Sequence, residues 1–513
     1  MVANRRDLTA DVLVAGAGPT GLAVALQAAA HGARVRVVER RAQAFRPSRA
    51  IVVAPRTLEV LRPLGVVDAL RDRAREVSSA RLYLGSRTLD VEAGDLELPG
   101  TPYPPLTLLR QADVEEVLAA ALAERGIVVE RGVELVELDG PAGSGRPVLR
   151  TASGKERVRS RFVVGCDGAQ STVRGCAGIA WPGGPYGHDV LLADVELEGL
   201  TPHALHAAAG RSGLLFAFAA GEHAPWRLLA TAPARRTGDP SVTVTELRDL
   251  LGVVWPAVRI TSVAWAERIA VQHRFAARFR QGRVFLAGDA AHVHSPAAAQ
   301  GMNTGLQDAA NLGWKLAFAS TAADPQQLLG SYDLERRPVA RAVLCLTHLV
   351  FWAEAGTDPA AALLRGTLVP LAAPWLARLP GRRGLTTGAL RTLSGLWVGY
   401  RASPLSVDGA GAGRIRAGDR LPDAQVGPGA RRVHELLARP GMHVLAPATA
   451  PPPCRPNTWV HVHRLDAVPG GGLLAVRPDG YVGFSAGAQD RAGLARWLDR
   501  SGAATDPPRG DPA

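Results

Sequence analysis

The first part of the chain alternates between short apolar runs and a helical pattern. Residues 11–15 (DVLVA) form an apolar run suited to a buried parallel strand, and glycines follow at once. Residues 22–30 then have the apolar spacing of a helix, and a second apolar run over residues 34–38 ends on Glu39. The pattern predicts one strand-helix-strand unit with a glycine-rich turn after its first strand.

The middle of the chain changes periodicity twice. Residues 108–125 have the pattern of an amphipathic helix. Between about 180 and 275 the helical signals become weak, and short apolar runs such as 214–219 and 227–231 predict an antiparallel sheet. Residues 285–287 then predict another short buried strand.

The last part of the chain is first helical and then mixed. The pattern is strongly helical over residues 305–318 and mostly helical over 330–400. After the Gly- and Pro-bearing stretch 403–413, α/β character resumes, with apolar runs at 433–437, 443–445, 473–476 and 481–484. These runs are sufficient for a separate small domain.

A glycine motif, Gly16-Ala-Gly18-Pro19-Thr-Gly21, joins the first predicted strand to its helix. Gly16 permits the tight turn, Gly18 lets the backbone approach a pyrophosphate, and Gly21 allows close packing of helix on strand, while the helix N-terminus supplies N–H donors. Glu39, eighteen residues after Gly21, can accept hydrogen bonds from ribose hydroxyls. The motif predicts a dinucleotide site but does not distinguish FAD from NAD.

Composition and charge exclude several classes of partner. The net charge of +12 comes almost entirely from arginine, and no dense Arg run with interleaved aromatic residues indicates nucleic acid. The apolar stretch 361–379 is interrupted by arginines and prolines, so no membrane span is expected. The N-terminus lacks the pattern of a signal peptide, which together with the widely spaced cysteines favours the cytoplasm.

No metal is expected either. The four cysteines, at positions 166, 176, 345 and 454, form no C-x-x-C pair, so neither a zinc site nor a disulfide framework is indicated. His292 and His294 form an H-x-H pair without a third ligand nearby, which favours packing or capping roles.

Two later segments specify the nucleotide. Residues 162–174 read FVVGCDGAQSTVR, and residues 282–305 read GRVFLAGDAAHVHSPAAAQGMNTG. They resemble the Asp-Gly and Gly-Asp motifs of the class A flavoprotein monooxygenases, the family of p-hydroxybenzoate hydroxylase and phenol hydroxylase, and in particular bacterial aromatic polyketide hydroxylases. The resemblance covers roughly residues 10–345 and implies bound FAD.

The resemblance also implies roles for single residues. Glu39 would hold the adenosine ribose, and Asp289 the ribityl or pyrophosphate region. Asp167 and Gly168 would support the FAD fold and pyridine-nucleotide docking, although an Asp in such a turn is also a common cap or turn residue. The expected cofactor-binding set is Gly16, Gly18, Pro19, Gly21, Glu39, Arg40, Arg49, Gln111, Leu135 (by its backbone), Asp167, Gly168, Gly288, Asp289, Pro296, Gly301, Met302 and Asn303.

The reaction would take place on the flavin itself, so no catalytic side chain is assigned. Pro296, Gly301 and Met302 would flank the isoalloxazine, and backbone amides of residues 300–303 would face its N1 and C2 carbonyl, where negative charge gathers on reduction. In the family, reduced FAD and O₂ form a C4a-hydroperoxide that oxygenates an electron-rich carbon. NADPH or NADH would be the reductant, and it needs no second glycine fingerprint because it binds transiently.

The expected substrate is a small aromatic molecule, polycyclic by the resemblance, and the enzyme is expected as a monomer or homodimer. Phe216, Phe218, Trp226 and Arg227 are candidates for the pocket, although aromatic residues at strand spacing are more often core. Baeyer-Villiger or epoxidising oxygenation remains open, as does a non-catalytic flavin-binding protein. A halogenase is disfavoured because its W-x-W-x-x-P segment and reactive lysine are not recognisable, and the two later motifs oppose a purely NAD-dependent dehydrogenase.

The expected fold is α/β, with an antiparallel substrate sheet inserted into a Rossmann-like FAD-binding domain. A helical linker follows, then a domain that resembles the thioredoxin-like C-terminal domain of phenol hydroxylase relatives but lacks the C-x-x-C motif. The expected limits are 1–180 with 276–345 for the FAD-binding domain, 181–275 for the sheet domain, 346–410 for the helical segment and 415–502 for the C-terminal domain.

Overall fold

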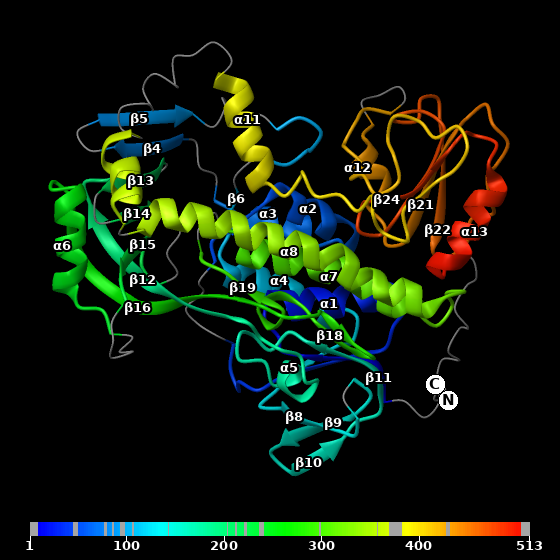
Figure 1. Cartoon of the computed structure of the whole chain (residues 1–513), viewed down its shortest axis with the longest axis horizontal. Coiled ribbons are helices and arrows are strands. Elements are labelled where there is room, and N and C mark those ends of the chain that lie inside the picture. The colour runs from blue at the N-terminus through cyan, green and yellow to red at the C-terminus, as the bar shows by residue number, and fades with distance from the viewer. Residues whose placement is uncertain are drawn as a thin grey trace.

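The computed structural model describes most of the 513-residue chain (Figure 1). The described residues are 9–44, 50–75, 79–84, 87–92, 98–104, 107–141, 143–202, 204–210, 213–219, 223–234, 241–296, 299–356, 358–368, 382–426 and 431–503.

A six-stranded sheet organises the first region, with the order β17-β18-β11-β1-β2-β7. Its strands are β1 (Ala10–Ala15), β2 (Val35–Glu39), β7 (Val129–Arg131), β11 (Ser160–Gly165), β17 (Arg280–Gln281) and β18 (Val284–Leu286). β18, β11, β1, β2 and β7 run parallel, and only β17 is antiparallel. The carboxyl ends of β1, β11 and β18 therefore lie along one edge of the sheet.

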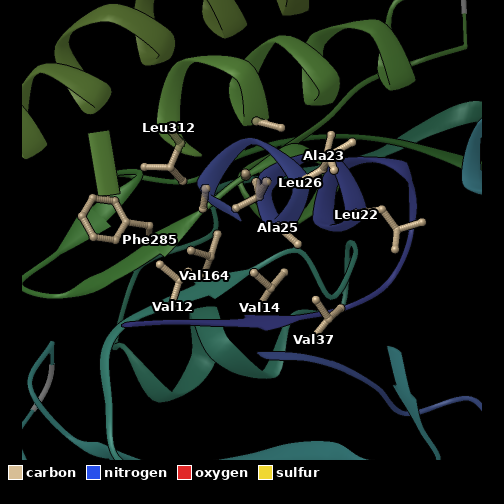
Figure 2. Close-up of a cluster of buried hydrophobic side chains, with 14 of the residues drawn as sticks. Val12, Val14, Leu22, Ala23, Ala25, Leu26, Val37, Val164, Phe285 and Leu312 are labelled. Carbon is tan, nitrogen blue, oxygen red and sulfur yellow. The ribbon is translucent and has the colours of Figure 1, made fainter. Parts of the chain in front are cut away.

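Helix α1 (Pro19–Ala30) follows β1 and confirms the predicted strand-helix-strand unit. Figure 2 shows Leu22 and Leu26 of this helix above Val14 of the sheet, with Leu312 of helix α7 (Gly301–Phe318) on the other side. All four side chains are buried, and each contributes roughly 1.5–3 kcal/mol by leaving water. α1 is thus sandwiched between the sheet and α7.

Smaller elements complete this region. They are the ribbon of β3 (Val52–Val53) and β6 (Thr107–Leu108), the sheet of β8 (Glu134–Asp139), β9 (Arg146–Thr151) and β10 (Gly154–Arg157), and the helical elements α2 (Pro55–Leu61), η2 (Arg62–Leu64), α3 (Val67–Arg73), α4 (Gln111–Ala123), α5 (Thr172–Cys176) and η4 (Gly288–Ala290). α4 confirms the amphipathic helix predicted for residues 108–125.

An eight-stranded sheet forms the second region, with the order β19-β16-β12-β15-β14-β13-β4-β5. Its strands are β4 (Ser79–Leu84), β5 (Arg87–Glu92), β12 (Gly183–Glu198), β13 (Ala204–Gly210), β14 (Gly213–Phe218), β15 (Trp226–Pro233), β16 (Arg259–Phe275) and β19 (His292–Val293). The predicted runs at 214–219 and 227–231 are antiparallel strands.

This sheet is larger than the segment 181–275 expected to form it, because β4 and β5 join it through a parallel pair of β4 with β13. Helix α6 (Val244–Val254) was not expected within that segment. It begins at Thr243, whose side chain accepts a hydrogen bond from the backbone N–H of Glu246, and it packs Leu247 and Leu251 on one face of the sheet.

Helix α8 (Pro325–Ala355) runs between the eight-stranded sheet and the C-terminal region (Figure 1). By length and composition it is the one helix of the described residues that could cross a membrane. It also carries Glu335 and Arg336, both buried in ion pairs, and it packs on α7. Helix α9 (Pro359–Leu363), a π-helix (Leu364–Leu368) and α11 (Arg382–Leu393) continue the helical segment.

The C-terminal region is a five-stranded mixed sheet, with the order β20-β24-β23-β21-β22. Its elements are β20 (Val407–Asp408), α12 (Val433–Leu436), β21 (Met442–Pro447), β22 (Val460–Leu465), β23 (Leu473–Val476), β24 (Val482–Ala486) and α13 (Arg491–Ser501). The predicted strands at 443–445, 473–476 and 481–484 are confirmed within a residue or two. This sheet packs on Trp314 and Phe318 of α7.

Candidate functional site

Three loops meet where β1, β11 and β18 end, and they carry the three sequence motifs. Gly16 has a φ of +103°, and a Cβ there would lie 2.3 Å from the carbonyl oxygen of Cys166. A Cβ on Gly21 would lie 1.9 Å from the carbonyl oxygen of Gly16. Close packing therefore requires these two glycines. Gly18 differs, because a Cβ there would meet nothing within 4 Å, which leaves room for a ligand beside its backbone.

Two helix N-termini are uncapped at this edge. α1 begins after Gly18, with Pro19 at its first position, and α7 begins after Gln300; neither receives a side-chain cap. Their first N–H groups have no partner within the helix and carry positive potential. Thr20 of α1 packs closely against Gly305 of α7: a Cβ added to Gly305 would lie only 2.2 Å from Thr20 Oγ1. The site thus has two neighbouring N-termini suited to negatively charged groups.

Glu39 lies beside the glycine motif, at the end of β2. Its Oε2 accepts a hydrogen bond from the backbone N–H of Ala17 at 2.9 Å, and its Oε1 accepts one from Arg41 N–H at 3.0 Å. The Glu39 side chain is only partly buried. Arg40 is exposed, and Arg49 lies outside the described residues.

Gln111 and Leu135 lie on neighbouring elements of the same region. Gln111 is the first residue of α4; its backbone N–H donates to Ala50 O at 2.8 Å and its Nε2 to Glu115 at 2.9 Å. Leu135 is buried in β8 within the main core, so only its backbone is available to a ligand.

Asp167 and Gly168 follow β11. Asp167 Oδ2 accepts a hydrogen bond from Val173 N–H at 3.1 Å, which fixes the start of α5. Burial raises the pKa of this carboxyl. Asp167 therefore makes the contact of a turn or cap residue. Gly168 has a φ of +84° and open space at its Cβ position.

The Gly288-Asp289 turn is held by a residue that sequence reasoning missed. Asp308 of α7 is fully buried and accepts hydrogen bonds from Gly288 N–H at 3.1 Å, from His292 Nε2 at 2.7 Å and from Arg336 Nε at 2.7 Å. Burial acts to raise the pKa of Asp308, but Arg336 and His292 outweigh it and the pKa is lowered. The available signal was an acid on the apolar face of a predicted helix.

Asn303 fixes the start of α7. Its Oδ1 accepts hydrogen bonds from Ala54 N–H and Thr57 Oγ1, both at 2.8 Å, and its Nδ2 donates to Val52 O at 3.1 Å and Ala299 O at 2.9 Å. The amide side chain is thereby committed to β3, α2 and the preceding turn. Any contact of Asn303 with a cofactor must come from its backbone.

The turn before α7 is strained. Ala299 has a φ of +52° and is the one non-glycine residue with positive φ in the described ranges. Such a residue costs of order 1–3 kcal/mol and persists where its surroundings fix it. Gly301 and Met302 follow at the start of the helix, and both are partly exposed. Pro296, before the turn, is exposed.

One face of the eight-stranded sheet packs against the β3-β6 ribbon. The rings of Phe216 and Phe218 in β14 stack with their centroids 5.9 Å apart. Phe218 also packs with Ile51 and Leu108 at the β3-β6 ribbon. Arg227 of β15 lies on the same face.

Arg227 is neutralised there by a carboxylate. It pairs through Nε and Nη2 with Asp194, at 2.5 and 3.0 Å, and its guanidinium lies 5.4 Å from the Trp265 ring. Trp226, also a pocket candidate, points to the opposite face and packs in the cluster around α6, so it belongs to the sheet core. The alternation of side chains along β15 separates these two neighbours.

Comparison with known proteins agrees with this geometry. Residues 9–347 match the family described as FAD binding domain. The chain is 34% identical to 6-methylpretetramide 4-monooxygenase of Streptomyces rimosus, over 92% of this chain and 90% of that protein. The anhydrotetracycline hydroxylase OxyS of Streptomyces rimosus superposes with a TM-score of 0.77 at 28% identity, covering 96% of this chain and 99% of that chain.

A third similar structure is the Diels-Alderase PyrE3 of pyrroindomycin biosynthesis, with a TM-score of 0.74 at 26% identity over 95% of this chain and 98% of that chain. The fold alone therefore does not determine the reaction. The family match covers well over half of the chain, and the identity to a monooxygenase extends over nine-tenths of both proteins. This chain belongs to the FAD binding domain family and is an FAD-dependent monooxygenase.

Proposed function

We propose that this enzyme uses NADPH or NADH and O₂ to hydroxylate a polycyclic aromatic polyketide. The observation that carries the proposal is the edge where Gly18 is open and α1 and α7 begin without side-chain caps, together with an aromatic sheet face that packs on the β3-β6 ribbon next to the start of α7. The names of the monooxygenase and hydroxylase relatives, which give 6-methylpretetramide and anhydrotetracycline, support a substrate of this kind.

The residues at this edge fit FAD. The pyrophosphate would lie beside Gly18 at the start of α1, and Glu39 would bind the adenosine ribose. Asp289, on the turn held by Asp308, would face the ribityl chain. When bound and reduced, FAD supplies the chemistry that activates O₂ and delivers one oxygen atom.

The chain itself supplies electrostatics and positioning. The first amides of α7, near Gly301 and Met302, would stabilise negative charge on the reduced ring, and Asn303 keeps that helix start fixed through four hydrogen bonds. Phe216 and Phe218 would offer aromatic faces to a flat substrate and exclude water from it. Asp194 balances the charge of Arg227, so this wall is neutral where an aromatic molecule would lie.

The cytoplasmic location, a monomeric or homodimeric state and the domain limits given above, with β4 and β5 added to the sheet domain, are part of this proposal. We interpret the five-stranded C-terminal sheet as thioredoxin-like in architecture and as a packing domain. It lacks a C-x-x-C pair, and it buries Trp314 and Phe318 of α7. Asp167 and Gly168 are assigned to support of the FAD loop.

The test is the visible spectrum of the purified protein, followed in one cuvette by anaerobic NADPH or NADH and then air. The proposal expects a flavin spectrum that bleaches with the nicotinamide, faster with a polycyclic phenol present, and recovers in air. A protein that carries no flavin after reconstitution with FAD would refute it. A flavin that no nicotinamide reduces would favour a non-redox role, of which the PyrE3 fold relative is the precedent.

The product decides between two oxygenations. NMR of the product would show a new phenolic hydroxyl for hydroxylation, and a ring-inserted oxygen or an epoxide for the second candidate, Baeyer-Villiger or epoxidising chemistry.

A further inference from the structure

A cavity of about 350 Å³ lies between α3 and the start of α4. Three arginines line it: Arg73 at the end of α3, Arg75 just after it, and Arg110 directly before α4. Its floor is apolar and consists of Leu108 and Leu109. The volume lies within the range of small-molecule sites and is sufficient for part of a dinucleotide.

The three guanidinium groups differ in their partners. Arg110 is bound by Asp113 through two hydrogen bonds, at 2.7 and 2.8 Å. Arg73 Nη1 makes two long contacts, 3.5 Å to Glu116 Oε2 and 3.5 Å to Asp113 O, and the Arg73 and Glu116 side chains are about half exposed. Arg75 Nη1 donates to Ala219 O at 3.0 Å, and within the described ranges Arg75 forms no ion pair. The lining therefore carries one more positive than negative charge, and the unbalanced charge is on Arg75.

The floor of this cavity is connected to the candidate flavin site. Leu108 pairs with Val52 in the β6-β3 ribbon, and Leu109 N–H donates to Ile51 O at 2.9 Å. Val52 O accepts the hydrogen bond from Asn303 at the start of α7. Thus a single ribbon separates the arginine-lined cavity from the helix start assigned to the flavin ring, and Gln111, which follows Arg110, belongs to the expected FAD contacts.

We propose that this cavity binds the phosphates of the reduced nicotinamide dinucleotide, with Arg75 and Arg73 as the main contacts. The inference rests on the proposed function, because it assigns a docking site to that function's reductant. A guanidinium binds a phosphate through two parallel hydrogen bonds, and Arg75 uses one of its five N–H donors on Ala219. Leu108 and Leu109 provide the apolar part of the lining beside these arginines.

The test uses the FAD-loaded enzyme and the substitution Arg75→Gln. Calorimetric titration with 2′,5′-ADP and with ADP measures binding without turnover, and anaerobic stopped flow gives the dependence of flavin bleaching on NADPH and NADH. A charge-assisted hydrogen bond contributes about 1.5–3 kcal/mol, so the dissociation constants should rise roughly ten- to hundredfold while the limiting bleaching rate and the flavin spectrum stay unchanged. Arg71→Gln changes an exposed arginine within α3 that does not line the cavity; it is the matched control and should change nothing.

The two phosphate sources are distinguished by the nucleotide. An effect on 2′,5′-ADP and NADPH alone assigns the 2′-phosphate, and an equal effect on ADP and NADH assigns the diphosphate. Unchanged dissociation constants for all four would overturn the inference, and so would a selective increase in KM for the aromatic substrate. If neither NADPH nor NADH reduces the flavin of the wild-type enzyme, the proposed function fails. The inference about the cavity is still tested separately, because the 2′,5′-ADP titration compares the dissociation constants of Arg75→Gln and wild type without any flavin reduction.

Discussion

Asp308→Asn would test whether one buried charge holds the cofactor loop against α7. Oδ1 of Asp308 accepts from Arg336, and Oδ2 accepts from both His292 and Gly288 N–H. Asparagine keeps the shape but replaces one oxygen by an NH₂ donor. Whichever way the amide turns, a donor meets a donor, and the charge of fully buried Arg336 loses its balancing carboxylate.

The magnitude follows from burial. Removal of one partner of a buried ion pair typically costs about 3–5 kcal/mol, since the remaining charge stays in a medium of low dielectric. For a cooperative unit of roughly 150–250 residues this lowers Tm by about 6–20 °C. The Gly288 turn is fixed partly by the same carboxylate, so FAD affinity should fall as well, by about tenfold or more. Differential scanning fluorimetry and titration of the apoprotein with FAD measure the two effects.

Asp249→Asn is the matched control, because Asp249 is exposed on α6 and far from this network; its Tm and FAD affinity should stay within error of wild type. A double variant, Asp308→Leu with Arg336→Met, removes both charges and should lose less than the sum of the two single variants. If Asp308→Asn melts at the wild-type temperature and binds FAD equally well, the assigned role of Asp308 is wrong.

Three further predictions rest on single contacts. Gly18→Ala should fold normally but bind FAD at least tenfold more weakly, whereas Gly21→Ala should lower Tm, because its Cβ would strike Gly16 O at 1.9 Å; equal behaviour of the two would contradict the open-site interpretation. Phe216→Ala, which truncates a partly exposed ring on the face of Phe218, should raise KM for the aromatic substrate and cost less stability than Trp226→Ala, which lies on the opposite face and should cost about 3–5 kcal/mol without altering KM. Burial lowers the pKa of His443 to about 3, so unfolding takes up a proton as pH falls below 6.5; the free energy of unfolding should decline from there toward pH 3 by up to about 1.4 kcal/mol per pH unit, Tm should fall with it, and His443→Gln should flatten the decline.

The sequence was sufficient for features that depend on neighbours in the chain. The β1-α1-β2 unit follows from apolar periodicity and the glycine turn, and the parallel order β18-β11-β1 brings the three motifs to one edge. Open space beside Gly18 and the crowding at Gly16 and Gly21 agree with the separate physical roles expected of these glycines.

Long-range contacts were beyond the same reasoning. Asp308 and Arg336 lie on different helices, and nothing in their local patterns specifies that they meet. Trp226 and Arg227 were both pocket candidates, and only the packing of α6 on one side of the sheet shows that Trp226 faces away from Phe218 and Arg227. Similarly, β4 joins a sheet formed by much later residues, through pairing with β13.

Two consecutive residues of α8 connect the C-terminal sheet to the cofactor loops. Glu335 accepts hydrogen bonds from Arg477 at 2.7 Å and from Lys315 of α7 at 2.7 Å, whereas Arg336 binds Asp308. Burial would raise the pKa of Glu335, but Arg477 and Lys315 outweigh it and the pKa is lowered.

The orientation of α7 therefore depends on two neighbouring residues of α8: Glu335, which binds Lys315, and Arg336, which binds Asp308. Fully buried ion pairs are costly to desolvate and are weak evidence for stability, yet the loss of one partner is strongly destabilising. Their physical effect here is to allow one register of α7 on α8, because a shift by one turn would leave Lys315 or Asp308 without its partner. The start of α7, which carries the amides assigned to the flavin, is thus fixed by contacts at Asn303 and also by the C-terminal sheet through Glu335 and Arg477.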